Sequence, residues 1–204
     1  MLKKGLFITF EGADGCGKTT QINLLKEYLE NKGFKVLLTR EPGGIGLGEK
    51  IREILLNYDG EVSSKAEAFL FLADRAQNID VIVKPAIDAG KIVLCDRHTD
   101  STVAYQGYGR GVDLNKIKTL NLLATGGIVP SLTYVFDIDV ETSMARVGKN
   151  KDRMESAGVE FHNRVREGYL ALAKDEPSRV KVINSADTIE NIFEQVKAIF
   201  NDIS

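Results

Sequence analysis

The sequence predicts an α/β protein in which a five-stranded parallel sheet is covered by helices on both faces. Short apolar runs rich in β-branched residues alternate with longer helix-period segments, and a glycine-rich turn follows the first run. Near-continuous apolar strands are typical of parallel sheets, because both faces of such sheets are buried. The expected strands are LFITF at 6–10, KVLLT at 35–39, KIVLCD at 91–96, LTYVFD at 132–137 and RVKVI at 179–183.

Helix-period segments separate these strands. The first helix is expected from about Thr19 to Lys32, with an apolar stripe and Gly33 in the stop position. Further helices are expected after Gly48, after Ser64, over 81–89, and from Leu114, Val140, Phe161 and Thr188. The expected core positions of the first and last helices are Ile22, Leu25, Leu29, Ile189, Ile192, Phe193, Val196, Ile199 and Phe200.

The helix after Ser64 carries two faces of different character. Ser64 with Glu67 matches a capping box. Helical spacing predicts a core stripe of Ala66, Phe69, Leu70 and Ala73. Phe71 falls on the other side, beside Asp74, Arg75 and Asn78. That face suits the stacking of a base on Phe71, and packing of Phe71 under a neighbouring helix is the alternative.

Length and composition limit the class of protein. A chain of 204 residues with 43% hydrophobic and 27% charged residues fits one globular domain, residues 1–204. A net charge of -2 gives no general attraction for nucleic acid or an anionic membrane. Cys16 and Cys95 lie far apart without metal-ligand spacing, and no membrane-length apolar span occurs. We therefore expect a cytoplasmic protein with free thiols.

The strongest motif follows the first strand directly. GADGCGKT, from Gly12 to Thr19, satisfies GxxxxGK[ST] and opens onto a helix, which predicts a P-loop NTPase fold. In such a loop, backbone N–H groups and the helix N-terminus bind phosphate oxygens. Lys18 is expected to reach the β- and γ-phosphates, and Thr19 to bind Mg²⁺. The sequence therefore predicts a site for a nucleoside triphosphate with Mg²⁺.

Charged residues also end the second and third strands. Asp96 lies at the carboxyl edge of the sheet, where a carboxylate can hold Mg²⁺ through water. Arg97 follows it and Arg40 ends the second strand, so both are placed to contact phosphate. A surface salt bridge is the alternative for Asp96 and Arg97. Lys18, Arg40 and Arg97 together suit two phosphorylated ligands that face each other.

The accumulated motifs resemble the thymidylate (dTMP) kinase family over nearly the whole chain. They are FITFEGADGCGKTTQ, TREPGG, LFLADRA, DRHTDSTVAYQG, DRME and FHNRVREGYLALA. The resemblance implies transfer of the γ-phosphoryl group of ATP to dTMP, giving dTDP and ADP in dTTP synthesis. It also implies Mg²⁺ as the cofactor, ATP and dTMP as substrates, and a homodimer.

The resemblance assigns the dTMP site residue by residue. It implies that Phe71 stacks on thymine and that Arg75 binds its carbonyl. Asp14 binds the sugar 3′-hydroxyl, Tyr105 favours a deoxy sugar, and Arg40 and Arg97 handle the acceptor phosphate. The full implied dTMP set is Asp14, Arg40, Phe71, Arg75, Arg97, Ser101, Thr102, Tyr105 and Gln106.

The resemblance also assigns the ATP site and a lid. Arg146 is implied to stack on adenine. The charged segment from Gly148 to Glu160, whose composition is consistent with a mobile, solvated segment or with a plain surface loop, matches the lid. The P-loop carries Cys16 where some relatives have a basic residue, which implies a catalytic cation from the lid. Arg153 leads, with Lys149 and Lys151 as helpers. The implied ATP-binding set is Gly12, Ala13, Asp14, Gly15, Cys16, Gly17, Lys18, Thr19, Thr20 and Arg146, and the implied catalytic set is Lys18, Arg97 and Arg153.

Two other functions are weighed against this one. A P-loop kinase for another nucleoside monophosphate or small metabolite shares the motif, and assays with several nucleotides distinguish it. A GTP-binding switch normally carries an NKxD motif, but NKIK at Asn115 and NKDR at Asn150 lack the aspartate.

Overall fold

A single parallel sheet forms the centre of the molecule. The computed structural model describes residues 5–148 and 152–203. Its sheet has the order β2-β3-β1-β4-β5, so the first strand lies in the middle. The five expected strands are confirmed as β1 (Phe7–Gly12), β2 (Val36–Arg40), β3 (Ile92–Asp96), β4 (Leu132–Asp137) and β5 (Val180–Asn184).

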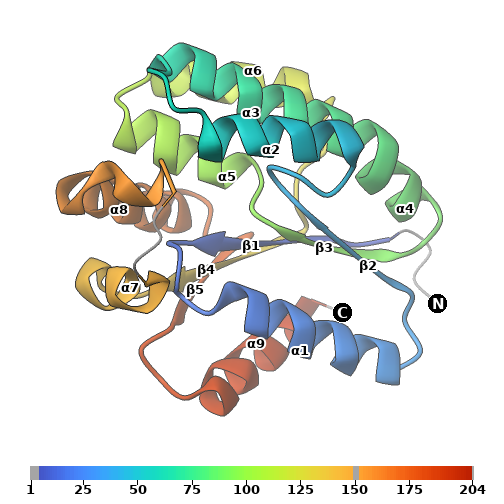
Figure 1. The fold of residues 1–204 in the computed structure, drawn as a ribbon. Coiled ribbons are helices and arrows are strands. Elements are labelled where there is room, and N and C mark those ends of the chain that lie inside the picture. The colour runs from blue at the N-terminus through green and yellow to red at the C-terminus, as the bar shows by residue number, and fades with distance from the viewer. Residues whose placement is uncertain (1–4, 149–151, 204) are drawn as a thin grey trace.

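Helices cover both faces of the sheet, as predicted. In Figure 1, α1 and α9 lie below it, and α2, α3, α4, α6 and α8 lie above it. The α-helices are α1 (Lys18–Asn31), α2 (Gly46–Asn57), α3 (Ser64–Asn78), α4 (Lys84–Asp88), α5 (Thr99–Thr102), α6 (Leu114–Thr125), α7 (Val140–Val147), α8 (Val159–Asp175) and α9 (Ile189–Ile203). Two π-helical segments, Ile79–Val83 and Val103–Gly109, and a 3₁₀ turn, Glu155–Ala157, complete the described part.

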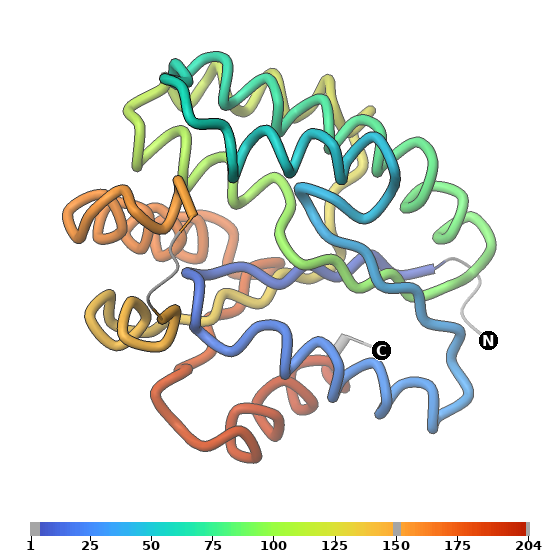
Figure 2. Tube along the Cα trace, viewed as in Figure 1, coloured from blue at the N-terminus to red at the C-terminus, as the bar shows by residue number. Residues whose placement is uncertain are grey.

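The strand register brings the predicted charged residues to one edge. Arg40 of β2 pairs with Asp96 of β3, and Asp96 pairs with Phe10 of β1. Gly12, where the P-loop begins, pairs with Phe136 of β4. The chain turns from β1 into α1 at the end of the sheet where α7 and α8 also lie (Figure 2). This edge is therefore where the phosphate-binding groups gather.

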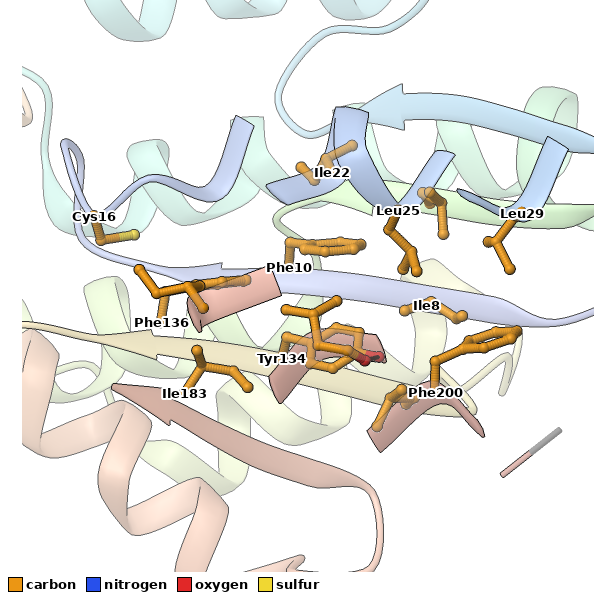
Figure 3. Close-up of a cluster of buried hydrophobic side chains, with 14 of the residues drawn as sticks. Ile8, Phe10, Cys16, Ile22, Leu25, Leu29, Tyr134, Phe136, Ile183 and Phe200 are labelled. Carbon is orange, nitrogen blue, oxygen red and sulfur yellow. Dashed lines mark hydrogen bonds between the residues drawn. The ribbon is translucent and has the colours of Figure 1, made fainter. Parts of the chain in front are cut away.

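The largest hydrophobic cluster lies between the sheet and helices α1 and α9. The rings of Phe10, Tyr134 and Phe136 lie near one another there, with centroids 5.2–6.4 Å apart. The predicted stripe of α1, with Leu25 and Leu29 fully buried, packs on them (Figure 3). Gly33 has φ +85°, so the expected glycine stop after α1 is confirmed. Of the stripe predicted for α9, Ile189 is exposed instead.

The core stripe predicted for α3 is wrong. Phe69 is 58% exposed, Ala66 and Ala73 are exposed, and Leu70 is partly buried. The opposite face is buried, and it carries Glu67, Ala68, Leu72, Asp74, Arg75 and Asn78. The polar members of this face have hydrogen-bond partners on other elements, which compensate for their burial.

The capping box is also corrected. Ser63, not Ser64, is the N-cap, because its hydroxyl oxygen accepts a hydrogen bond from Ala66 N at 3.3 Å. The side chain of Glu67 turns into the protein instead of back to the helix end. The helix expected over 81–89 is the continuation of α3 through the π-helical segment into α4. Residues 99–109, for which no helix was predicted, are helical.

None of the helices within the described residues combines the length and the apolar character that a membrane-spanning segment requires.

Candidate functional site

The P-loop has the conformation that its glycines predict. Gly12, Gly15 and Gly17 have φ values of +133°, +75° and +91°, which side chains with a Cβ rarely adopt. A Cβ on Gly15 would also lie 2.7 Å from the carbonyl oxygen of Ser143. Gly17 precedes α1 without a side-chain cap, so the first N–H groups of the helix stay available for an anion.

Lys18 is held under this loop. Its Nζ donates to the carbonyl oxygens of Gly12, at 3.1 Å, and Ala13, at 2.8 Å. Cys16 is 1% exposed and belongs to the hydrophobic core near Phe136 (Figure 3), and its Sγ lies under the loop, 3.6 Å from Lys18 Nζ. The loop therefore presents backbone N–H groups and one lysine to an anion, and the Cys16 side chain contributes packing.

A phosphate cavity opens in front of the loop. It is lined by Asp14, Gly15, Gly17, Lys18, Thr19, Thr20, Arg40, Glu41, Arg52, Asp96, Arg97 and Arg146. Seven of the ten residues expected to bind ATP line it, and Gly12, Ala13 and Cys16 do not. Arg40 forms a half-exposed ion pair with Glu49, at 3.0 Å, at the rim.

A base pocket adjoins the phosphate cavity. Eight of the nine residues expected to bind dTMP line it, and Arg40 lines only the phosphate cavity. Phe71 is half-buried on its wall, so it does not pack under a neighbouring helix as a core residue. The pocket is lined by Asp14, Glu41, Pro42, Arg52, Leu56, Phe71, Arg75, Arg97, Ser101, Thr102, Tyr105, Gln106, Asp152 and Met154.

Arg97 lies where the two cavities meet. Its guanidinium donates to Asp14 Oδ1 at 2.7 Å, to Tyr169 Oη at 3.2 Å and to Ser101 Oγ at 3.4 Å. It also lies 5.0 Å from the centre of the Tyr105 ring. Burial alone would raise the pKa of Asp14, but Arg97 and Lys18 lower it to about 2. An ionised Asp14 therefore orients the arginine at neutral pH.

Glu11, which was not predicted from the sequence, accepts hydrogen bonds from residues close to Arg97. Its carboxylate accepts hydrogen bonds from His98 N, at 2.7 Å, and Ser101 Oγ, at 2.5 Å. Burial, followed by the charge of Asp100, raises the pKa of Glu11 to about 7. The signal that could have identified Glu11 is a glutamate that directly follows an apolar strand and precedes the P-loop.

Arg75 is the most completely engaged side chain of the base pocket. It is 1% exposed and donates to Glu41 Oε2, Thr102 Oγ1, Asn121 Oδ1 and His98 O at 2.6–2.8 Å. A guanidinium has five N–H donors. Four are used, so one has no partner among the described residues and can bind a carbonyl in the pocket.

Arg52 is a further cation that sequence reasoning missed. It lies on α2, lines both cavities and donates from Nη1 to Pro42 O at 3.0 Å. Its place on a helix between Ile51 and Glu53 offered no clear local signal. Only the folding of α2 over the sheet edge brings it to Arg97.

Arg153, predicted to be a catalytic cation, is not brought to the phosphate cavity. Its Nη1 donates to Glu67 Oε2 at 2.6 Å and its Nε to Leu55 O at 2.9 Å. These contacts turn the guanidinium inward, between α2 and α3. Its neighbours Asp152 and Met154 line the base pocket instead. Lys149 and Lys151 lie outside the described residues, and the described part of the predicted lid consists of Gly148 and the segment from Asp152 into the start of α8.

The candidate metal ligands meet at the same cavity. Asp96 Oδ1 is buried without a hydrogen-bond partner among the described residues, and Thr19 lies across the cavity at the start of α1. In residues 5–148 and 152–203, no three His, Cys, Asp or Glu side chains are grouped to enclose a metal ion. This donor set suits Mg²⁺, which is usually held by few protein groups together with phosphate oxygens and water.

The parallel sheet, the P-loop at its carboxyl edge and the adjoining base pocket define a P-loop nucleotide-binding protein with room for two ligands. Comparison with known proteins gives the family. The thymidylate kinase family model matches residues 10–196, and the chain belongs to that family.

Proteins similar to this chain in sequence or in structure are also thymidylate kinases. A thymidylate kinase of Pelotomaculum thermopropionicum is 54% identical over 187 residues, covering 90% of this chain and 87% of its own. One of Desulfovibrio desulfuricans is 45% identical over 203 residues, covering 95% and 94%. The crystal structure of thymidylate kinase from Ehrlichia chaffeensis superimposes with a TM-score of 0.81 at 39% identity, covering 97% of this chain and 99% of that one.

Proposed function

We propose that this chain carries out the thymidylate kinase reaction, transfer of the γ-phosphoryl group of ATP to dTMP, across the two joined cavities. The observation that carries the proposal is that Asp14, Glu41, Arg52 and Arg97 line both of them. A triphosphate on the P-loop and a nucleoside monophosphate in the base pocket would therefore bring their phosphates together at Arg97. The products are dTDP and ADP, in dTTP synthesis.

The reaction needs positioning more than proton transfer. The second pKa of a phosphate monoester is about 6, so the attacking 5′-phosphate oxygen is already ionised at neutral pH. The obstacle is to bring two multiply charged anions into line. Lys18 holds the phosphates of ATP, while Arg97 and Arg52 neutralise the acceptor phosphate. Lys18 and Arg97 are therefore the proposed catalytic residues.

Mg²⁺ is the proposed cofactor. Thr19 would bind it directly and Asp96 through water, which accounts for an Asp96 Oδ1 that has no hydrogen-bond partner in the described part of the chain. When bound, the ion neutralises charge on the β- and γ-phosphate oxygens. The chain's own part is to hold the partly buried Asp96 carboxylate at the end of β3.

The remaining site residues have separate proposed roles. Phe71 stacks on thymine, and Arg75 donates its free N–H to a base carbonyl. Tyr105 closes the sugar side, with its hydroxyl buried and without a partner among the described residues. Asp14 accepts the 3′-hydroxyl. Arg40 contacts phosphate from the rim, and Arg146, which lines the phosphate cavity, stacks on adenine.

Phe71→Ala is expected to raise the KM for dTMP about 5- to 150-fold, because base–aromatic stacking is worth about 1–3 kcal/mol. The KM for ATP should change little, since Phe71 does not line the phosphate cavity. Steady-state kinetics measure both. The control is Leu123→Ala, which shortens an apolar side chain of α6 that is 80% exposed and lines neither cavity. Equal effects on both substrates would assign Phe71 a structural role.

We also propose that the chain forms a homodimer through the exposed face of α3. Phe69 is 58% exposed there and Ile54 of the adjacent α2 is 47% exposed, so the two helices present apolar groups to solvent. A second copy would bury them.

Phe69→Asp is expected to convert the dimer into a monomer, as light scattering after gel filtration would show, because a dimer would bury the new charge. Ile189→Asp, on the exposed side of α9, is the control and should leave the assembly unchanged. A dimer that survives Phe69→Asp would contradict this assignment of the interface.

Residues 1–204 are proposed to act as one kinase domain in the cytoplasm, without nucleic acid or membrane partners. Its two cysteines are free and buried, which suits a reducing compartment. A coupled assay with ATP and a panel of dTMP, dUMP, CMP, AMP and GMP tests the function. A clear preference for dTMP is expected. Preference for another monophosphate would indicate a different kinase, and GTP binding without phosphoryl transfer would indicate a switch.

A further inference from the structure

A buried carboxylate behind the base pocket binds three cationic or amide groups at once. Glu67 of α3 is 1% exposed. Its Oε1 accepts from Gln106 Nε2 at 2.9 Å and from Arg110 Nε at 3.3 Å. Its Oε2 accepts from Arg153 Nη1 at 2.6 Å and from Arg110 Nη2 at 3.3 Å. These four donors occupy the lone-pair positions that a carboxylate offers.

The two arginines keep Glu67 ionised. Burial alone would raise its pKa, but hydrogen bonds from Gln106 and Arg153 and the charge of Arg110 lower it below its usual range. An ionised carboxylate only accepts hydrogen bonds. The Gln106 amide must therefore turn its NH₂ group toward Glu67, because its carbonyl oxygen would face another acceptor there.

This orientation decides what Gln106 offers to a ligand. With Nε2 committed to Glu67, Oε1 is left as an acceptor and has no hydrogen-bond partner among the described residues. Gln106 and Arg75 both line the base pocket, and Arg75 retains one unused N–H. The pocket wall thus presents one donor and one acceptor to the edge of a base.

This pair of one donor and one acceptor is complementary to thymine but not to cytosine. Thymine carries a carbonyl acceptor at O4 and an N–H donor at N3, whereas cytosine carries an amino donor at N4 and an acceptor at N3. A base whose N3 is an acceptor would meet Gln106 Oε1 with like polarity, and the unpaired buried groups would weaken its binding.

We propose that Glu67 is a positioning residue that selects thymine over cytosine by fixing the orientation of the Gln106 amide. The inference rests on the proposed function and deepens it. Glu67 does not line the pocket and acts only through Gln106. Arg153 gains a role as well, because it helps to hold the Glu67 carboxylate in its ionised, acceptor-only form.

Glu67→Gln tests the proposal, because a glutamine can donate as well as accept and so lets the Gln106 amide rotate. We expect the ratio of kcat/KM for dTMP to that for dCMP to fall about tenfold, the value of one hydrogen bond. The dTMP-to-dUMP ratio should change less than about threefold, since both bases carry N3–H. Asp88→Asn, which removes an exposed ion-pair carboxylate in α4, should leave both ratios unchanged.

Glu67→Gln would leave Arg110 and Arg153 without a charged partner, and the variant could therefore fail to fold. A second variant tests the proposal without that risk. Gln106→Met keeps the Glu67 ion pairs and removes the amide, so it should lower the same ratio. A dTMP-to-dCMP ratio that stays at the wild-type value in a folded variant overturns the inference. Calorimetric binding of dTMP and dCMP to the wild-type chain separates the two proposals. Preferential dTMP binding without turnover would contradict the proposed function and support the selection of thymine.

Discussion

Lys18→Met is expected to lower kcat for dTMP phosphorylation by at least about 10²–10³-fold. A single preorganised donor to a reacting oxyanion contributes that much, and Lys18 is the P-loop cation. Its Nζ is already oriented by the carbonyl oxygens of Gly12 and Ala13, so the charge needs little rearrangement to reach a phosphate. A coupled assay at saturating ATP and dTMP measures the loss.

The control for this variant is Lys26→Met. Lys26 lies on the same helix, but it forms an exposed i,i+4 ion pair with Glu30. Its replacement should leave kcat within about twofold and the melting temperature nearly unchanged, because such pairs contribute little. A Lys18→Met protein that folds normally and keeps kcat within tenfold of the wild type would contradict the assignment of Lys18.

Arg75→Met is expected to destabilise the fold by about 3–5 kcal/mol. The substitution would remove four hydrogen bonds and leave the carboxylate of Glu41, itself 2% exposed, without its arginine partner. Burial alone would raise the pKa of Glu41, but His98 and Arg75 lower it to about 2. Losing Arg75 therefore leaves a buried charge only partly compensated. Urea unfolding at pH 7 measures the change.

Arg40→Met is the matched control for stability. Its ion pair with Glu49 is about half exposed on both sides, so its loss should cost less than about 1 kcal/mol. Comparable destabilisation in the two variants would show that the buried Arg75–Glu41 ion pair contributes no more to the free energy of unfolding than an exposed pair does.

The sheet and the phosphate-binding end could be predicted from the sequence because their signals are local. Each strand is a continuous apolar run, and the stripe of α1 repeats within one helix. Binding of phosphate by the P-loop depends on backbone N–H groups, glycine conformation and the next lysine, all within eight residues. The strand ends then placed Asp96 and Arg97 at the same edge without further information.

Helix α3 shows where local periodicity fails. The rule that an apolar stripe faces the core predicted that Phe69 is buried, but Phe69 is exposed. The rule uses only the spacing of apolar residues within the helix and takes no account of which other segments pack on it. The face that is buried carries Glu67, Asp74 and Arg75, whose partners lie 23 to 86 residues away along the chain. A sequence window as short as one helix therefore does not contain both members of any of these pairs.

The sequence by itself determined the α/β architecture, the P-loop and the family signatures, since these depend on residues close together in the chain. Only the tertiary structure decided that Arg153 turns inward to Glu67 and that Arg52 lines the cavity in front of the P-loop. The same holds for the orientation of Gln106. The physical reason is that a buried charge is stable only where distant segments supply its partners, and those segments are brought together by the whole fold.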